Sequence, residues 1–126
     1  MAKILVVEDD RFLLNAYKIK LNKAGFDVST ATNGEEALQS LETVRPDLIL
    51  LDLILPQKDG FYFLQQYKQK FPSSPVPVIV LSNLGQQEDI ARALSLGASY
   101  YAVKSDISLS DLVSTINGLL SKSSPK

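Results

Sequence analysis

Short apolar runs and longer amphipathic stretches alternate five times along the 126 residues of the chain. Short apolar runs bounded by polar or turn residues are typical of buried strands. Apolar positions spaced three and four residues apart are typical of helices that cover a sheet. The predicted strands are residues 3–7, 27–31, 48–51, 76–81 and 99–103. The predicted helices are residues 11–24, 34–44, 60–71, 86–96 and 109–120.

Capping residues support several of these helix ends. Gly25 follows the first helix, where a glycine in the left-handed conformation commonly ends a helix. Asn33 precedes the second helix and Ser108 the last, each with an acid three residues on, which is the spacing of a capping box. The side chains predicted to face inward are Leu14, Tyr17, Leu21, Ala24, Ala37, Leu38, Leu41, Val44, Leu64, Tyr67, Phe71, Leu112, Val113, Ile116, Leu119 and Leu120.

Five repeats of strand then helix are typical of an α/β fold. Such a chain forms a parallel sheet with helices on both faces, joined by right-handed crossovers. The length suits one domain, which we expect over residues 1–121, followed by a polar tail at residues 122–126.

Composition narrows the chemistry that this domain can perform. The chain has no cysteine and no histidine, which excludes disulfides, thiolate or imidazole metal ligands, and a histidine phosphocarrier within the chain. The formal net charge is −1, and no apolar run approaches the ~20 residues that span a bilayer. We therefore expect a soluble, cytoplasmic protein that does not bind nucleic acid directly and has no membrane partner.

Candidate functional residues follow four of the five predicted strands. They are Glu8 and Asp9, then Asp52, then Ser82 and Asn83, then Lys104. Parallel strands end at the same edge of a sheet, and ligands bind there in folds of this class, so we expect these side chains to converge. Asp52 follows the most apolar strand and lies where the rigid core meets solvent.

Three converging carboxylates repel one another unless a cation is bound. With oxygen ligands alone, the favoured cation is Mg²⁺. Asp52 beside a cation, the Ser82 hydroxyl and the Lys104 ammonium form a set suited to phosphoryl transfer. Asp52 is then the nucleophile, while the cation, Ser82 and Lys104 neutralise the phosphoryl oxygens.

Over nearly its full length, the chain resembles the receiver domain of two-component response regulators. The motifs that carry the resemblance are residues 6–10 (VVEDD), 52–56 (DLILP), 59–60 (DG), 80–82 (VLS), 96–98 (LGA) and 101–104 (YAVK). The resemblance implies a flavodoxin-like (βα)₅ fold with strand order 2-1-3-4-5. It also implies a phosphoacceptor switch and not an enzyme that turns over substrate.

The resemblance implies a role for each site residue. Asp52 accepts a phosphoryl group from a sensor histidine kinase or a histidine phosphotransfer protein. Mg²⁺ is held by Asp9, Asp52 and the backbone carbonyl of Ile54, with Glu8 acting through water. The residues that bind the phosphoryl group or switch are Ser82, Asn83, Lys104 and Tyr101. The face built from the fourth helix, fifth strand and fifth helix then changes its preference for a downstream partner.

One departure from the family pattern lies beside the lysine. Most receivers place a proline with a cis peptide bond after it, whereas Ser105 follows Lys104 here. A cis bond before serine costs about 3–4 kcal/mol, so we expect a trans bond. We also expect Lys104 still to reach the phosphoryl site, because its stem is long and flexible.

Three other functions compete with this interpretation. A Mg²⁺-dependent phosphatase with an aspartyl nucleophile needs an acid two residues after Asp52, where Ile54 stands. A nucleotide or flavin binder needs a glycine- or hydroxyl-rich turn after the first strand, where acids stand. A pseudo-receiver that no longer takes phosphate would lack the aspartate or the lysine, and both are present.

The resemblance extends to receivers that consist of a single domain. We therefore expect the chain to signal through a surface that binds a partner. We expect it to be a monomer or a weak phosphorylation-dependent dimer. A fragment of a longer regulator is also compatible with the sequence.

Overall fold

The computed structural model describes residues 1–123. Its strands are β1 (Lys3–Val7), β2 (Asp27–Ala31), β3 (Leu48–Leu51), β4 (Val78–Ser82) and β5 (Tyr100–Val103). Its helices are α1 (Arg11–Lys23), α2 (Gly34–Ser40), α3 (Gly60–Lys70), α4 (Gln87–Ser95), the 3₁₀ turn η1 (Lys104–Asp106) and α5 (Leu109–Ser123). Strands and helices alternate in the predicted order.

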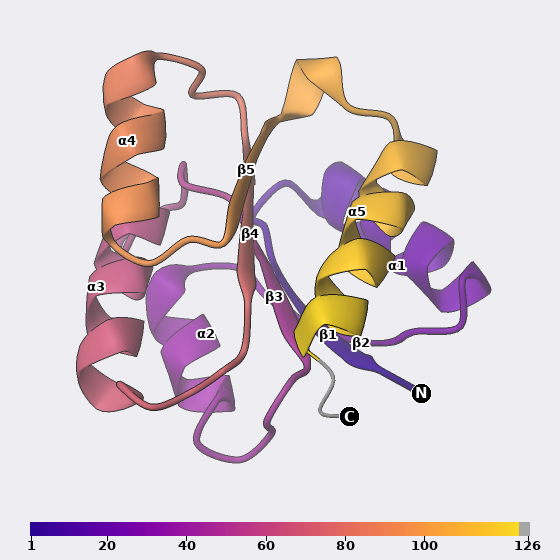
Figure 1. Ribbon diagram of the computed structural model, residues 1–126, viewed down its shortest axis with the longest axis horizontal. Coiled ribbons are helices and arrows are strands. Elements are labelled where there is room, and N and C mark those ends of the chain that lie inside the picture. The colour runs from indigo at the N-terminus through magenta and orange to yellow at the C-terminus, as the bar shows by residue number, and fades with distance from the viewer. Residues whose placement is uncertain (124–126) are drawn as a thin grey trace.

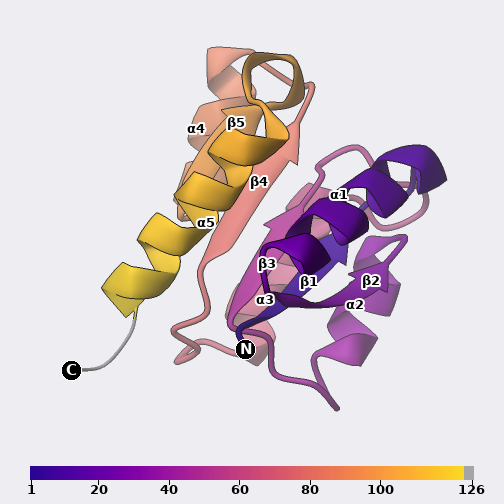
Figure 2. The ribbon, with the colours of Figure 1, turned by 90° about the vertical axis from the view of Figure 1, so that its right-hand side faces the viewer.

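The five strands form one parallel sheet in the order β2-β1-β3-β4-β5, which confirms the predicted fold class and strand order. Helices cover both faces: α1 and α5 lie on one, and α2, α3 and α4 on the other (Figures 1 and 2). β2 and β5 are the edge strands, and the site strands β1 and β3 are neighbours inside the sheet.

Each face of the sheet has its own apolar core. The core under α2, α3 and α4 includes Leu5, Val7, Ile49, Leu51, Phe61, Phe63, Leu64 and Val80. The core under α1 and α5 includes Ile4, Val6, Tyr17, Leu21, Leu48, Leu50, Leu112 and Ile116. Alternate residues of β1 and β3 serve opposite cores, which explains why both strands are continuously apolar.

The predicted helix caps form in the structure. The Asn33 side chain accepts a hydrogen bond from Glu36 N at 2.8 Å, and Ser108 Oγ accepts one from Asp111 N at 3.0 Å. Gly25 ends α1 with a φ of 95°, a conformation that favours glycine. Asp10 caps the other end of α1, accepting hydrogen bonds from Phe12 N and Leu13 N.

The structure corrects two predicted inward positions. Ala24 is exposed, because it is the C-cap of α1 and lies beyond its apolar stripe. Val44 is 40% exposed, because α2 ends at Ser40 and turns follow, so the helical spacing no longer points it inward. Phe61 and Phe63 were not predicted to be buried, yet Phe63 is completely buried beside Leu64.

Other element boundaries also differ from the predicted ranges, among them those of β4, β5 and α5. β4 begins at Val78 and not at residue 76, because Pro77 has no N–H to donate and contributes only its carbonyl, which accepts from Ile49 N. β5 begins at Tyr100. α5 continues to Ser123, past the predicted start of the tail, and residues 124–126 of that tail lie outside the described residues.

Within residues 1–123, none of the helices combines the length and the apolar character needed to cross a bilayer.

Candidate functional site

The carboxyl ends of β1 and β3 hold two buried acids side by side. Glu8 follows β1 with 2% of its surface exposed, and Asp52 follows β3 with 5% exposed. Their backbones extend the sheet, since Glu8 N donates to Ala31 O and Asp52 N donates to Val7 O, both at 3.0 Å. The sheet therefore fixes the position of both carboxylates.

Glycines hold the loop that follows Asp52 against the sheet. Gly60 N donates to Leu53 O at 3.0 Å, and a Cβ at Gly60 would lie 2.5 Å from Asp52 O. Gly34 N, at the start of α2, donates to Lys58 O at 2.8 Å. A side chain at Gly60 would displace backbone, so this position requires glycine.

Lys104 reaches from the end of β5 into the space between the two acids. Its Nζ lies 2.7 Å from Glu8 Oε1 and 2.8 Å from Asp52 Oδ2. The other oxygens accept backbone hydrogen bonds, Glu8 Oε2 from Asp10 N and Asp52 Oδ1 from Ile54 N, both at 3.1 Å. Each carboxylate is thus oriented by one backbone N–H and one shared ammonium.

Burial and ion pairing have opposite effects on the pKa values of Glu8 and Lys104. Burial raises the pKa of Glu8, although the hydrogen bond from Lys104 opposes that effect. For Lys104, burial lowers the pKa, but the hydrogen bonds to Asp52 and then Glu8 outweigh it and raise the pKa above its usual value. Lys104 therefore stays charged throughout the neutral range.

The acids provide an oxygen donor set suited to a divalent cation. Glu8, Asp9 and Asp52 each offer a carboxylate oxygen, and the three oxygens lie within 4.8 Å of one another. Asp9 is exposed, so this cluster opens to solvent on its side. A small set of carboxylates that leaves room for water fits Mg²⁺. Ile54 lies beside the cluster, with 54% of its surface exposed.

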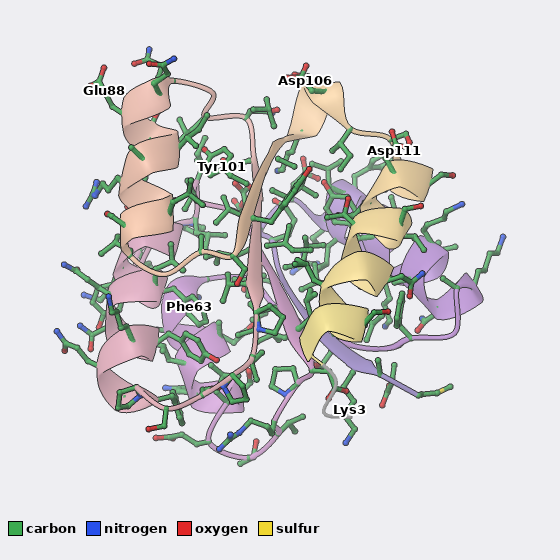
Figure 3. The ribbon with its side chains drawn as sticks, viewed as in Figure 1. Lys3, Phe63, Glu88, Tyr101, Asp106 and Asp111 are labelled. Carbon is green, nitrogen blue, oxygen red and sulfur yellow. The ribbon has the colours of Figure 1, made fainter. Side chains whose placement is uncertain are left out.

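The predicted residues of β4 and β5 lie nearby in different environments. Ser82 is completely buried, and its Oγ accepts a hydrogen bond from Leu84 N at 3.4 Å. Asn83 is exposed. Tyr101 is half-buried, and its hydroxyl donates to the Leu84 carbonyl (Figure 3 labels Tyr101). Burial, followed by the charges of Asp89 and Asp52, raises the pKa of Tyr101.

The chain contains no cis peptide bond within residues 1–123, so the Lys104–Ser105 bond is trans, as expected. The trans bond lies within η1, and Lys104 reaches Asp52 all the same.

One feature beside the site was not foreseen. A cavity of about 410 Å³ opens between α1 and α5, next to Lys104. Its lining includes Leu13, Tyr17, Leu81, Asn83, Ile107 and Leu112. Burial raises the pKa of Tyr17, which was predicted only as part of an apolar stripe. In the sequence, the sign of this cavity was the hydroxyl group of Tyr17 among the aliphatic residues of the first helix's apolar stripe.

The comparisons with known proteins identify the family. A family model described as the response regulator receiver domain matches residues 4–117. The chain belongs to this family. A solved structure of a receiver domain, that of the Francisella response regulator 1452, superposes with a TM-score of 0.90 at 30% identity. That superposition covers 98% of this chain and 100% of the other.

Curated relatives of this receiver domain are transcriptional regulators. The alkaline phosphatase synthesis transcriptional regulatory protein PhoP of Bacillus subtilis is 39% identical over 102 residues, which are 81% of this chain and 42% of PhoP. The DNA-binding dual master transcriptional regulator RpaA of Synechocystis is 32% identical over 120 residues, which are 95% of this chain and 49% of RpaA. The chain spans about half the length of the curated relatives that it matches.

These relatives overturn one expectation. The near-neutral charge of the chain predicted a protein without a nucleic-acid partner, but RpaA is described as DNA-binding and PhoP as a transcriptional regulator. The prediction from net charge fails because it considers only the residues that this chain contains. Net charge describes the surface of these 126 residues, whereas the relatives are about twice as long.

Proposed function

We propose that this receiver domain is a phosphoacceptor switch in which Asp52 takes a phosphoryl group from the phosphohistidine of a kinase or phosphotransfer protein. The observation that carries the proposal is the environment of Asp52. Its buried carboxylate is oriented by Ile54 N and paired with Lys104, next to two further acids.

In the proposed step, an Asp52 oxygen attacks phosphorus as the P–N bond of the phosphohistidine breaks. The bonding pair goes to the imidazole, which leaves neutral once it keeps or gains a proton. Lys104 and the Ser82 hydroxyl stabilise the negative charge on the phosphoryl oxygens. Neither histidine nor cysteine is present to compete as an acceptor.

Asp9, Asp52 and the Ile54 carbonyl are the proposed ligands of Mg²⁺, with Glu8 acting through water. A bound Mg²⁺ supplies positive charge that offsets the repulsion between carboxylate and phosphoryl group. Lys104 already neutralises part of that negative charge through both buried acids. The side chain at position 54 is apolar, so the acid that an aspartyl phosphatase needs there is missing.

Tyr101 and the loop after β4 are the proposed reporters of the phosphorylated state. The Tyr101 hydroxyl and Ser82 Oγ both contact Leu84, through its carbonyl and its N–H. A Ser82 hydroxyl that turns toward a phosphoryl group gives up its contact with Leu84 N. The loop and Tyr101 then rearrange, and Asn83 moves with them.

The test is incubation with acetyl phosphate and Mg²⁺, followed by intact mass measurement. The wild type should gain one phosphoryl group, and Asp52→Asn should gain none. Asp27→Asn is the matched control, since Asp27 is exposed on the distant edge strand β2 and should behave as wild type. Equal gain by Asp52→Asn and wild type would remove Asp52 from the central role.

A further inference from the structure

The cavity beside Lys104 lies between α1 and α5, which cover the same face of the sheet (Figure 2). Its volume is about 410 Å³. Small-molecule sites in proteins measure roughly 300–1,000 Å³, so the cavity is large enough to be one. Its lining comes from α1, from β4 and the residue after it, from η1 and from the start of α5. We call it the α1–α5 cavity.

Most of the wall of the α1–α5 cavity is apolar. The aliphatic residues that line it are Leu13, Ala16, Leu81, Ile107, Leu109 and Leu112. Leu81 and Leu112 belong to the buried core under α1 and α5, so the cavity reaches that core. Leu109 is 37% exposed and lies on the solvent side. A molecule that fills this space must be apolar over most of its surface, because polar groups placed against such walls lose their hydration.

The Tyr17 hydroxyl is a polar group inside this apolar space. Tyr17 lines the cavity and is only 6% exposed. Within residues 1–123, its hydroxyl forms no hydrogen bond with another group, although buried hydroxyls usually have a partner. No fully enclosed side-chain oxygen in that range lacks a partner, so this hydroxyl borders open space, and the cavity is that space. The cavity therefore offers an unpaired hydrogen-bond donor.

Charge selects a neutral ligand for the cavity. Lys104 lines it too, but the ammonium is bound to Glu8 Oε1 at 2.7 Å and to Asp52 Oδ2 at 2.8 Å. With Asp9, three carboxylates lie beside this one ammonium, so an anion in the cavity is repelled. A cation would lose its hydration among the leucines, and no carboxylate on the cavity wall offsets that loss.

We infer that the α1–α5 cavity is the binding site of a small neutral molecule with an apolar body of one or two rings and one acceptor, which accepts a hydrogen bond from the Tyr17 hydroxyl. A cyclic ketone, lactone or ether has this chemistry. A protein helix is a poorer occupant, because a single turn, about 10–12 Å across and about 5.4 Å long, already takes up the whole cavity.

The effect of such a ligand on signalling rests on the proposed function. Lys104 lines the cavity and also pairs with both acids of the phosphoacceptor site. Asn83, which follows β4, lines the cavity as well. A phosphoryl group on Asp52 that moves either side chain changes the cavity wall. By linkage, ligand binding and phosphorylation then alter each other's free energy by the same amount.

The experiment titrates the isotope-labelled chain with 1-indanone, a neutral two-ring ketone, observed by amide chemical shifts. Indane has the same rings without the acceptor, and indane-1-carboxylate carries an anion in place of the ketone. The test variant is Tyr17→Phe, which keeps the aromatic ring and removes only the hydroxyl. Its matched control is Tyr62→Phe in α3, on the other face of the sheet.

A second pair of variants tests the space itself. Ala16→Leu adds bulk to the cavity wall, and Ala91→Leu makes the same change at an exposed position of α4. Urea unfolding checks that all four variants remain folded. If Ala16→Leu does not fold, Tyr17→Phe alone decides the outcome.

We expect 1-indanone to shift the amides of the cavity lining, chiefly residues 13–17 and 104–112, and Tyr17→Phe to bind it about fivefold more weakly. Tyr17→Phe should bind indane at least as tightly as wild type does, and indane-1-carboxylate should bind more weakly than the ketone. Ala16→Leu should lose both neutral ligands, and the two control variants should bind as wild type.

The inference would be overturned if 1-indanone produced no saturable shifts, or shifts centred outside the cavity lining. Equal affinity of wild type and Tyr17→Phe for 1-indanone would also contradict it, because the hydroxyl would then take no part in binding.

A parallel arm repeats the titration after treatment with acetyl phosphate and Mg²⁺, with intact mass as the measure of phosphorylation. The affinity for 1-indanone should change in phosphorylated wild type and stay constant in Asp52→Asn. Phosphorylation of a chain that does not bind 1-indanone would refute the ligand site alone. Binding in the cavity by a chain that gains no phosphoryl group would refute the proposed function and the coupling, and would leave the ligand site standing.

Discussion

The two halves of the sheet end differently at the edge that carries the site. At β1 and β3, backbone N–H groups hold both buried carboxylates, and the backbones of Glu8 and Asp52 continue the sheet. At β4 and β5, Ser82 Oγ has one long contact, the N-cap Gln86 of α4 makes no side-chain cap, and Tyr101 bonds to a loop carbonyl. Past the strand ends, the β1–β3 half is held by backbone hydrogen bonds, and the β4–β5 half is held by a few side-chain contacts. We call them the fixed half and the responding half.

The fixed half is suited to holding a nucleophile in place, and the responding half is suited to changing its arrangement. A nucleophile needs a constant position, which the fully hydrogen-bonded strands of the fixed half provide. A surface that reports phosphorylation, as proposed above, needs two arrangements of similar free energy, which a small number of contacts allows. Lys104 joins the halves, because its backbone belongs to the end of β5 and its ammonium to the acids of β1 and β3.

The largest expected effect comes from disturbing the fixed half at Gly60. In Gly60→Ala, the new Cβ meets backbone at 2.5–2.6 Å, so we expect a loss of about 3 kcal/mol in the free energy of unfolding. Urea unfolding measures it. Gly118→Ala in α5 is the control, because its Cβ meets nothing within 4 Å and should stabilise the helix. Similar stability in both variants would show that the loop after β3 is not fixed.

The next largest effect should come from removing the Lys104 ammonium, which joins the two halves. Lys104→Met leaves Glu8 and Asp52 facing each other without a counter-charge, and we expect a loss of about 2 kcal/mol without Mg²⁺. Added Mg²⁺ should restore more stability to this variant than to wild type. Thermal unfolding with and without Mg²⁺ tests this, with exposed Lys68→Met as control. A variant as stable as wild type in chelator would contradict the prediction.

A smaller effect should appear in the responding half alone. Tyr101→Phe removes the hydrogen bond to the Leu84 carbonyl, which we expect to cost about 1 kcal/mol. Amide hydrogen exchange should become faster in the loop after β4 and stay unchanged at Glu8 and Asp52. Faster exchange in both places would mean that the two halves open together, and the comparison would fail.

The smallest effect is a pH dependence at the far end of α3. Burial raises the pKa of Tyr67, although its hydrogen bond with Ser74 opposes this. The folded state then holds the proton more tightly than the unfolded chain, so stability falls as pH rises above about 10. Tyr67→Phe should lose a few tenths of a kcal/mol less over that range, measured by urea unfolding at several pH values. Parallel curves would contradict it.

The fold was predictable because one pattern is repeated. Five apolar runs separated by helical stripes define alternating strands and helices, and parallel strands then bring Asp52, Glu8 and Lys104 to one edge. Periodicity failed where a helix stopped early, as at Val44, and where one helix is buried over a wide face, as at Phe63. The hydrophobic pattern of a helix does not indicate how far the elements packed against that helix extend.

The site was predictable as a set of residues and not as an arrangement. The sequence places three consecutive acids after β1 but does not say that Glu8 points inward and that Asp9 stays exposed. The hydrogen bond from Ile54 N to Asp52 and the cavity between α1 and α5 depend on backbone geometry. Both emerge only when the loops are placed.

The pairing of Glu8 with Lys104 joins residues 96 positions apart in the chain. During translation, a chain that has left the ribosome only as far as β4 holds Glu8 and Asp52 without their ammonium. Its acids repel one another, and its last interior strand lacks a neighbour. A product truncated at β4 should therefore be less stable than the complete domain, which pairs both acids only once its final strand has been made.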